Sequence, residues 1–440
     1  MTRIVFIGAG SVVFTRQLAT DLLRFDDLDP FELVLHDVDP DRLAVAAGTA
    51  TQLAAQFGKP MTVRAEANRR KALDGADFVV NTIQVGGIDG TYKDLRIPAT
   101  YGLLQTIGDT TGVGGVFRGL RTFPVLSQIA ADMAAVCPDA WLLNYTNPMA
   151  MNIWWLSVAA PAIKSVGLCH SVFWTVHGLC ELIGVPVGEV TYRAAGVNHQ
   201  AWLYQWERDG QSLYPKLDAV IEADPEMKRR VRVEMYRRIG YYPTETSEHS
   251  SEYLSWFLRS KEQIEQFRIE PLQYIGISEE NVAEYVAAKK AMDEGGPLPP
   301  HEDEGAAEYA PQVIHSMCTG TVREIHANVP NAGLIDNLHQ GACVEVPARV
   351  DASGITPIAV GSIPAQGAIH NRTYLSVAEL AIKATLDGNR DLVKQALLCD
   401  PNASSTLTPD QIWAMCDELF EAHLPNLPES LGGAVPLVLP

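Results

Sequence analysis

The first 170 residues alternate short apolar runs with segments in which apolar residues recur every three or four positions. Residues 3–7 form a short apolar run, and strand-like runs cover residues 31–36, 61–65, 77–83, 141–145 and 164–169. Between them the spacing is helical, as in residues 41–57 and 116–136. Strands that alternate with helices predict parallel βαβ units with right-handed crossovers. We therefore expect an α/β fold, a Rossmann-like doubly wound parallel sheet.

The pattern changes near residue 200. A hairpin is expected at 201–210, a long helix at 225–240, an amphipathic stretch up to 293 and a surface loop at 295–304. Turns and short strands follow at 331–351 and 361–371, then helices at 373–423 and a Pro-rich tail. We predict a Rossmann-like domain over residues 1–198 and a second, mixed α/β domain over residues 199–440.

The first strand ends in a glycine turn typical of dinucleotide sites. Gly8 would allow the tight turn, and Gly10 and Ser11 would bring backbone N–H groups to a pyrophosphate at the helix N-terminus. Val13 stands where the usual third glycine would be. Asp37 ends the second strand, where an acid binds ribose hydroxyls and favours NAD over NADP. The alternative is an ordinary βαβ unit with an Asp cap.

Three further turns follow strands or precede helices. The turn that begins at Gln84 could lie beside the centre of a cofactor. Residues 108–115 are glycine-rich, which indicates positive φ angles or close ligand approach, although a purely structural loop has the same composition. Asn147 follows the strand at 141–145 and would present its amide at the carboxyl edge of the sheet, where open α/β sheets bind ligands.

Cys169 and His199 each end a strand-like run. A thiolate and an imidazole suit a divalent transition metal, and two protein ligands leave coordination positions open for a substrate. A buried cysteine and a hydrogen-bonded histidine would look the same in the sequence.

Composition narrows the class of protein. The chain has 440 residues, 47% of them hydrophobic, and a net charge of -19, which argues against nucleic acid or an anionic membrane as the main partner. Its seven cysteines are scattered without a CxxC pair, which indicates reduced thiols. No signal peptide or transmembrane run is apparent. We expect a cytoplasmic protein.

In combination the motifs resemble glycoside hydrolase family 4, and within it the melibiase-type α-galactosidases, over about residues 3–425. The matching segments are Gly8-Ala-Gly-Ser11, residues 108–122, residues 144–151, Val166-Gly-Leu-Cys-His-Ser171, Ala195-Gly-Val-Asn-His199, residues 240–249 and residues 333–346.

The resemblance implies a hydrolysis that requires NAD⁺ and a divalent metal, typically Mn²⁺, an exception to the two-carboxylate scheme of most glycosidases. Hydride transfer from C3 to NAD⁺ makes the C2 proton acidic, and the metal stabilises the developing enolate. Loss of the aglycone, addition of water at C1 and return of the hydride complete the cycle without net NADH.

The resemblance also implies residue roles. Cys169 and His199 match the metal ligands, and Tyr241 matches the proposed C2 base, with Tyr242 as the neighbour that could be confused with it. His170 stands where some phospho-glycosidases of the family have Asp, the suggested leaving-group acid, and a histidine can serve as that acid near neutral pH. The change from Asp to His also argues against a 6-phospho-sugar.

Other matched positions belong to the binding sites. Asn147 matches a residue that binds sugar hydroxyls, and Asp109 and Arg118 are assigned to contact with the substrate or the cofactor. The residues that match the NAD site are Gly8, Gly10, Ser11 and Asp37, with Gln84 added from its turn.

We expect an NAD⁺- and Mn²⁺-dependent α-galactosidase that forms a homo-oligomer, a dimer or tetramer. The alternatives within the family are an α-galacturonidase, α-glucuronidase or α-glucosidase. A lactate/malate-type 2-hydroxy acid dehydrogenase would share the fold, but its Gly-Glu-His-Gly-Asp-like segment is missing. A catalytically dead sensor would be expected to lose Cys169, His199 or Tyr241, and all three are present.

Overall fold

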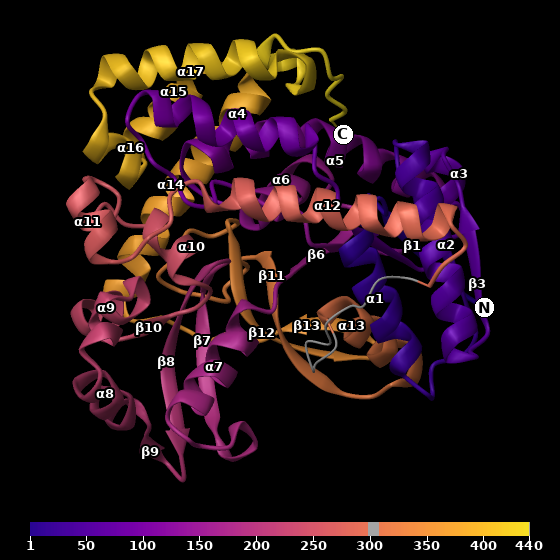
Figure 1. Cartoon of the computed structure of the whole chain (residues 1–440), viewed down its shortest axis with the longest axis horizontal. Coiled ribbons are helices and arrows are strands. Elements are labelled where there is room, and N and C mark those ends of the chain that lie inside the picture. The colour runs from indigo at the N-terminus through magenta and orange to yellow at the C-terminus, as the bar shows by residue number, and fades with distance from the viewer. Residues whose placement is uncertain (298–307, 440) are drawn as a thin grey trace.

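The computed structural model describes residues 1–297 and 308–439, so most of the loop predicted at 295–304 lies outside the described residues. A single sheet runs through the described chain (Figure 1). Its N-terminal half is parallel in the order β3-β2-β1-β4-β5-β6, the order of a dinucleotide-binding fold, which confirms the Rossmann-like prediction. These strands are β1 (Thr2–Ile7), β2 (Phe31–His36), β3 (Met61–Ala65), β4 (Phe78–Asn81), β5 (Trp141–Asn144) and β6 (Lys164–Leu168).

The helices that connect these strands begin and end where the local chemistry favours it. Asp39 caps one of them, α2, by accepting N–H bonds from Asp41 and Arg42, and Gly58 ends it in the left-handed region. The connecting helices are α1 (Val12–Arg24), α2 (Pro40–Phe57), α3 (Arg69–Leu73), α4 (Gly87–Thr100), α5 (Gly112–Val136), α6 (Met149–Ala159) and α7 (Ser171–Leu182).

Antiparallel strands extend the same sheet beyond β6. Strand β11 pairs with β6 and is followed by β12, β7, β8 and β10. The two predicted domains therefore share one sheet, and their boundary near residue 198 stays a prediction. The added strands are β7 (Thr191–Val197), β8 (Gln200–Arg208), β9 (Gln211–Ser212), β10 (Tyr242–Pro243), β11 (Arg323–Pro330), β12 (Cys343–Asp351) and β13 (Gly354–Pro357).

The prediction of one long helix over residues 225–240 is wrong, because two separate elements occupy this range. Its first part is a 3₁₀ turn, Pro225–Arg229, and Arg230 adopts an extended conformation before α9 (Val231–Ile239). Asp224 and Pro225 form the start signal of a short separate element. The other helices are α8 (Tyr214–Ala223), α10 (Ser247–Glu252), α11 (Lys261–Gln266), α12 (Gln273–Asp293), α13 (Tyr309–Thr319), α14 (Ala365–Asp387), α15 (Arg390–Cys399), α16 (Pro401–Thr406) and α17 (Pro409–His423).

Two further expectations need correction. Residues 365–371, predicted as turns and short strands, form the start of α14. The Pro-rich end is not a loose tail, because Leu427 and Leu431 are buried and Pro428 forms a bridge with Val435. These apolar side chains pack in the main hydrophobic core, and the amino-acid composition of the segment alone does not show this packing.

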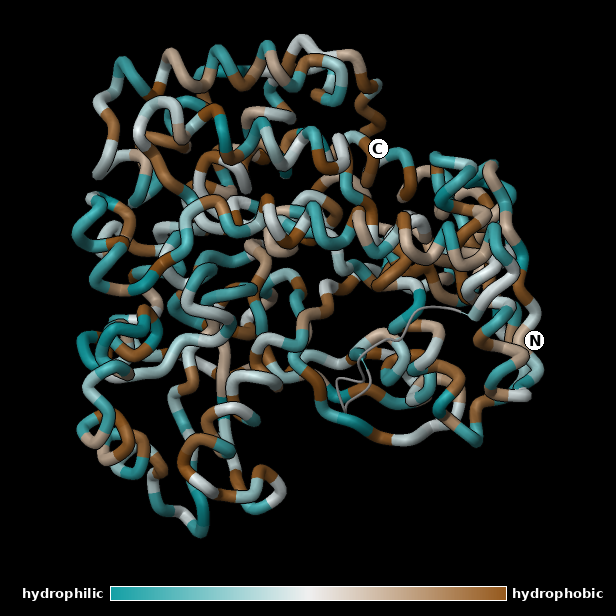
Figure 2. The backbone as a smooth tube through the Cα atoms, viewed as in Figure 1, coloured by the Kyte–Doolittle hydropathy of each residue, from teal (hydrophilic) through white to brown (hydrophobic). Residues whose placement is uncertain are grey.

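The helices cover the sheet with apolar faces. Figure 2 shows hydrophobic and hydrophilic segments alternating along α17, at the top of the view, as expected of a helix with one buried side. Helix α12 lies across the front in Figure 1 and contacts α1, α2 and α4, so that it covers the carboxyl edge of the parallel strands. Among the described residues, no helix is both long enough and apolar enough to cross a membrane.

Candidate active site

A cavity of about 570 Å³ lies at the carboxyl ends of β1, β2 and β4. This volume is within the roughly 300–1,000 Å³ of small-molecule and cofactor sites. All five residues predicted to bind NAD line it, although they come from three separate turns: Gly8, Gly10, Ser11, Asp37 and Gln84. The structure therefore brings this predicted set together in one place.

The glycines of this cavity have distinct reasons to lack a side chain. Gly8 has a φ of +86°, and Gly10 lies so close to Asp37 that a Cβ would meet its Oδ2 at 2.6 Å. Asp37 Oδ2 accepts the Gly10 N–H at 2.7 Å, and its Oδ1 accepts the Asp39 N–H at 2.9 Å. A carboxylate has further lone pairs, so Asp37 can hold the turn and still accept from a ribose hydroxyl. The geometry fits a dinucleotide.

Cys169 and His199 also come together. Cys169 follows β6, and His199 occupies the two-residue turn of the β7–β8 hairpin with a φ of +64°. The Cys169 sulfur, one His199 ring nitrogen and one Glu245 oxygen all lie within 4.8 Å of one another. A second set with the same spacing contains Asp109, His199 and His249. The predicted pair thus has three further potential donors around it.

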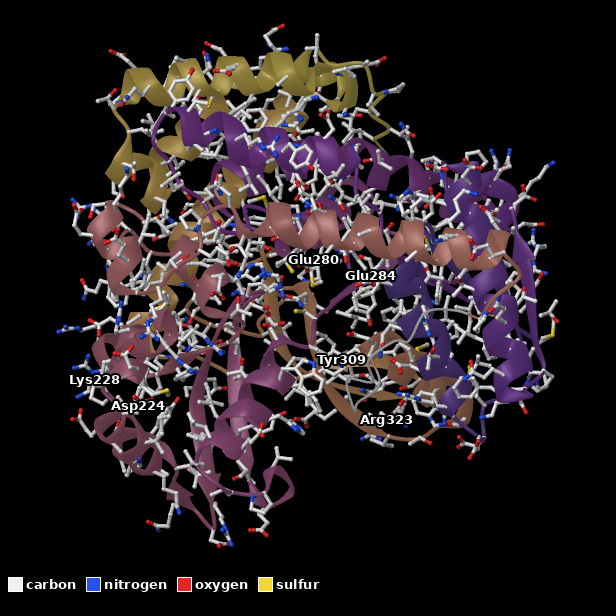
Figure 3. All side chains as sticks on the ribbon, in the orientation of Figure 1. Asp224, Lys228, Glu280, Glu284, Tyr309 and Arg323 are labelled. Atoms are coloured by element: carbon white, nitrogen blue, oxygen red, sulfur yellow. The ribbon has the colours of Figure 1, made fainter. Side chains whose placement is uncertain are left out.

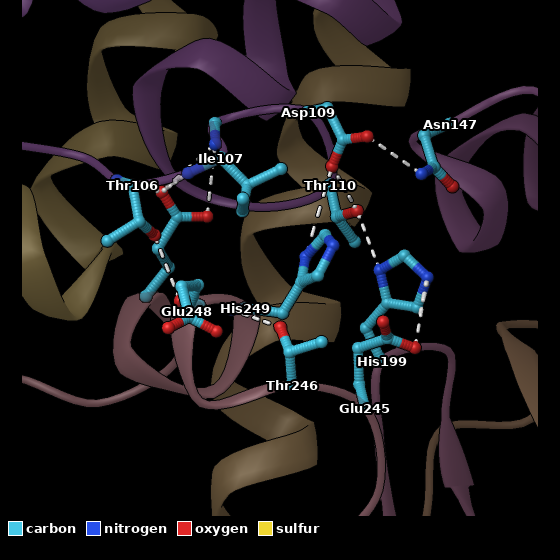
Figure 4. A network of polar contacts seen from close by, with 12 residues as sticks. Thr106, Ile107, Asp109, Thr110, Asn147, His199, Glu245, Thr246, Glu248 and His249 are labelled. Atoms are coloured by element: carbon cyan, nitrogen blue, oxygen red, sulfur yellow. Dashed lines mark hydrogen bonds and ion pairs between the residues drawn. The ribbon is translucent and has the colours of Figure 1, made fainter. Parts of the chain in front are cut away.

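Hydrogen bonds determine the tautomer of His199 (Figure 4). The Thr110 hydroxyl donates to Asp109 Oδ1 at 2.8 Å, and its oxygen lies 2.9 Å from His199 Nδ1. Because the hydroxyl has a single proton, Nδ1 must be the N–H donor of that second bond. Nε2 then carries the free lone pair, and it faces Glu245 Oε2 at 3.9 Å. An imidazole oriented in this way is a typical metal ligand.

The charge states favour a cation at this place. Burial lowers the pKa of His199 to about 4, so the ring is neutral near pH 7. Burial, with Glu245 and Glu345 nearby, raises the pKa of the Cys169 thiol well above its ordinary value. A bound dication would reverse that shift, since thiols deprotonate on coordination. A thiolate, a neutral imidazole and a carboxylate are suitable donors for a divalent transition metal.

The predicted substrate residues adjoin this cluster. Asn147 Nδ2 donates to Asp109 Oδ2 at 2.8 Å, and Asn147 Oδ1 is buried without a hydrogen-bond partner among the described residues. The Arg118 guanidinium donates to the Asn147 carbonyl at 3.3 Å and lies over the Tyr274 ring at 5.6 Å. Burial raises the pKa of Asp109, but His249 and Arg118 more than offset it and hold the pKa below its usual value. Asp109 is therefore a buried carboxylate.

The two adjacent tyrosines differ in their surroundings. Tyr242 is buried in the smaller of the two main core clusters, with the Arg232 guanidinium 5.2 Å from the centre of its ring. Tyr241 is partly buried against the larger cluster, which also contains residues of β6 and β7, the strands that precede Cys169 and His199. Within the described part of the chain, no hydrogen bond links Tyr241 to this pair. Its role as the base remains a prediction.

His170 follows Cys169 directly but faces other residues. Its Nδ1 lies 3.5 Å from Glu308 Oε2, and its ring packs edge-on against Tyr309 at 4.0 Å between centroids. Tyr309 is labelled in Figure 3, at the start of α13. His170 is not part of either potential metal set, so its assignment as leaving-group acid stays a prediction.

The second glycine-rich segment is only partly a loop. Helix α5 begins at Gly112 rather than at 116, because Gly114 and Gly115 pack against the preceding turn. A Cβ on Gly114 would lie 2.4 Å from the Gly108 carbonyl oxygen. The glycines thus allow residues 108–111 to fold back on the helix and place Asp109 and Thr110 beside His199.

Glu252 holds this turn from the other side. Its Oε1 accepts the backbone N–H groups of Thr106, Ile107 and Gly108 at 2.8–3.0 Å. Burial raises the pKa of Glu252 to about 8, although the N–H groups of Thr106 and Gly108 lower it. Glu252 therefore positions the turn that carries Asp109 without contacting the metal cluster.

Replacing Glu252 by alanine should lower the free energy of unfolding by roughly 3 kcal/mol or more, because each buried N–H left without an acceptor costs about 1–3 kcal/mol. Glu252→Gln should retain most of the stability, since the carboxyl is favoured in its neutral form and an amide oxygen can still accept. Urea unfolding of both variants tests this. Glu248→Ala, a change in the same helix α10, is the control, and equal losses in the alanine variants would refute the role.

Comparisons with known proteins agree on the family. The family 4 glycosyl hydrolase model matches residues 3–185, and the model of the family 4 C-terminal domain matches residues 194–403. The chain belongs to glycosyl hydrolase family 4. The predicted family is therefore confirmed over most of the chain, and the protein is an enzyme of a family that acts on sugars.

Curated family 4 relatives include two α-galactosidases. That of Bacillus subtilis is 38% identical over 98% of this chain and all of its own, and that of Rhizobium meliloti is 33% identical over 97% and 89%. A solved structure described as a putative glucosidase of Bacillus subtilis has a TM-score of 0.84 at 24% identity, over 95% of this chain and 99% of that one. A 6-phospho-α-glucosidase from gut microorganisms, solved with NAD and Mn²⁺, has a TM-score of 0.80 at 19% identity, over 97% and 99%.

Sequence reasoning missed three members of the site. Glu245, Thr110 and His249 lie in the matched segments but have no role among the sequence predictions. All three are polar residues in motifs shared with family 4. Their position in those motifs was the available signal, but it did not show which of several polar neighbours points inward.

Proposed function

We propose that this family 4 enzyme hydrolyses terminal α-galactosides and depends on NAD⁺ and a divalent metal, with Mn²⁺ as the preferred ion. The observation that carries the proposal is the cluster of Cys169, neutral His199 and Glu245 at the same edge of the sheet as the dinucleotide cavity. The identities of 38% and 33% to curated α-galactosidases support the sugar.

The chemistry of the two groups explains why one site would contain both. When bound, oxidised nicotinamide would accept hydride from C3 of the sugar, and the cation would stabilise negative charge on the C2 and C3 oxygens. Gly8, Gly10 and Asp37 would hold the dinucleotide, while Cys169 and His199 would hold the cation. Thr110 would keep the His199 lone pair directed at it.

The remaining residues would bind the sugar and move protons. Asn147 would bind a sugar hydroxyl through its free Oδ1, and Asp109 would orient Asn147. Tyr241 would remove the C2 proton. This choice is supported by its packing against the larger core cluster, whereas the Tyr242 ring is buried in the smaller one. His170 would protonate the leaving oxygen, with Glu308 beside its Nδ1.

The charges around Arg118 support an uncharged glycone. A C6 carboxylate or phosphate needs a free cation, but the Arg118 guanidinium lies near the buried carboxylate of Asp109 and over Tyr274. The alternative glycones are those of more distant relatives, an α-glucosidase of Erwinia rhapontici at 30% identity and an α-galacturonidase of Thermoanaerobacterium saccharolyticum at 27%.

A panel of nitrophenyl α-glycosides should be cleaved only when NAD⁺ and Mn²⁺ are both added to protein stripped of each. The expected substrate is the galactoside, because the Arg118 guanidinium already lies near the buried carboxylate of Asp109 and is not free to pair with a charged group at C6. Rates of nitrophenol release under reducing conditions measure this.

Two controls make the result decisive. NADH should not accumulate, since the cofactor is restored in each turnover, whereas a 2-hydroxy acid dehydrogenase would produce it. Cleavage of a uronide or a glucoside, but not of the galactoside, would show that the proposed sugar is wrong and would leave the proposed cofactor requirement in place. Cleavage that ignores both additions, after bound NAD⁺ and metal are shown to be absent, would overturn the proposal.

We also propose that the protein works in the cytoplasm as a homo-oligomer, a dimer or tetramer. Seven unpaired cysteines support a reducing compartment. The oligomer rests on the resemblance to the family, and light scattering of the purified protein would decide its size.

A further inference from the structure

We infer that Glu245 is a third protein ligand of the divalent metal. This inference rests on the proposed function, which assigns the metal to Cys169 and His199. Glu245 would add a charged oxygen donor to the sulfur of Cys169 and the nitrogen of His199, and the three donors would form one face of the coordination shell.

The distances place Glu245 within reach of a shared ion. The three donor atoms lie within 4.8 Å of one another, and Glu245 Oε2 is 3.9 Å from His199 Nε2. Donors at ~2.0–2.3 Å from one metal lie roughly 3–4.5 Å apart. A small inward movement of the side chains is enough to close the site. Nε2 is also the nitrogen that the Thr110 bond leaves with a free lone pair.

The backbone supports the same assignment independently. Few non-glycine residues of the described chain have a positive φ, and both His199, at +64°, and Glu245, at +73°, are among them. Such conformations persist at functional sites when the surroundings enforce them. The Glu245 N–H donates to the Thr175 hydroxyl at 3.1 Å, which ties the Glu245 backbone to α7, the helix that begins shortly after Cys169. Figure 4 shows Glu245 and His199 facing each other.

In the competing donor set, Asp109 is already engaged in hydrogen bonds. Asp109 accepts hydrogen bonds from Thr110 and Asn147 through its two oxygens, and His249 Nδ1 lies 4.0 Å from Asp109. In the set that contains Cys169 and Glu245, a thiolate and a carboxylate balance the two positive charges of the ion. Carboxylate oxygen also suits Mn²⁺ better than sulfur does.

The test measures metal binding rather than turnover. Mn²⁺ is titrated into full-length, metal-free protein under reducing conditions at fixed NAD⁺, with free Mn²⁺ followed by electron paramagnetic resonance. Glu245→Gln should weaken Mn²⁺ binding at least ~10-fold, and Glu245→Asp, which keeps the charge, should weaken it less. Glu248→Gln removes a nearby carboxylate outside the cluster and should bind as the unaltered protein does. Thermal unfolding of the metal-free variants confirms that each is folded.

The outcomes separate this inference from the function on which it rests. If Glu245→Gln binds Mn²⁺ like Glu248→Gln while Cys169→Ser does not, Glu245 is not a ligand and the proposed metal site stands. If Cys169→Ser also binds normally, the proposed site itself is wrong. Absorption spectra of the Co²⁺-loaded protein provide a second readout. If the sulfur-to-cobalt charge-transfer band persists in Glu245→Gln while the d–d bands change, Glu245 is a third ligand. If the d–d bands are unchanged, Glu245 is not a ligand.

Discussion

Replacing Cys169 by serine should reduce the metal-dependent hydrolysis of an α-galactoside by at least ~100-fold, the upper loss typical of residues that only support a ligand. The thiol is partly buried at the end of β6 and lies close to His199 and Glu245. A serine hydroxyl does not ionise near neutral pH, so the site would lose both a donor and a negative charge. Initial rates at several Mn²⁺ concentrations measure the loss.

Two controls show whether the loss comes from the metal site. Cys399→Ser, a change at an exposed thiol at the end of α15, should leave the rate unchanged. NAD⁺ affinity of Cys169→Ser, followed by fluorescence or calorimetry, should remain close to normal, because the dinucleotide cavity is formed by other turns. A near-normal rate in Cys169→Ser would remove this residue from the site.

The N-terminal half of the fold could be predicted because its signals are local. Buried parallel strands are continuous apolar runs, and β2, which is buried along its whole length, has the predicted bounds. The less buried β3 has the predicted bounds as well. The carboxyl ends of such strands meet at one edge. For this reason Gly8, Asp37 and Gln84, predicted from separate turns, line one cavity. Cys169 could be placed at the same edge by the same argument.

The other side of the site depends on long-range packing. His199 lies in a hairpin of the antiparallel strands, and Glu245 reaches it from a segment about 45 residues later in the chain. Glu252 contacts a turn 144 residues earlier. Nothing in the local pattern of residues 241–252 shows which carboxylate faces the cluster, because that choice depends on the positive φ of Glu245. A sequence pattern gives the residue types but not this direction.

The last expected result concerns Tyr241, whose replacement by phenylalanine should suppress exchange of the sugar C2 proton with deuterated solvent. Loss of a general acid or base typically costs ~10²–10⁴-fold in rate, and phenylalanine keeps the ring that packs against the larger core cluster. Tyr242→Phe is the matched control: its ring is buried in the smaller cluster, so exchange should persist. Nuclear magnetic resonance of substrate in D₂O, with NAD⁺ and Mn²⁺ present, reports the exchange.

A base at position 241 would work only if positive charge lies close to it. A free tyrosine has a pKa of about 10, and an opposite charge within a few ångströms favours the ionised form. The dication held by Cys169 and His199 would supply that charge, so exchange in the unaltered enzyme should also stop when Mn²⁺ is removed. Persistent exchange in Tyr241→Phe together with its loss in Tyr242→Phe would transfer the role to Tyr242. Exchange that survives in both variants would mean that a group other than these tyrosines removes the proton.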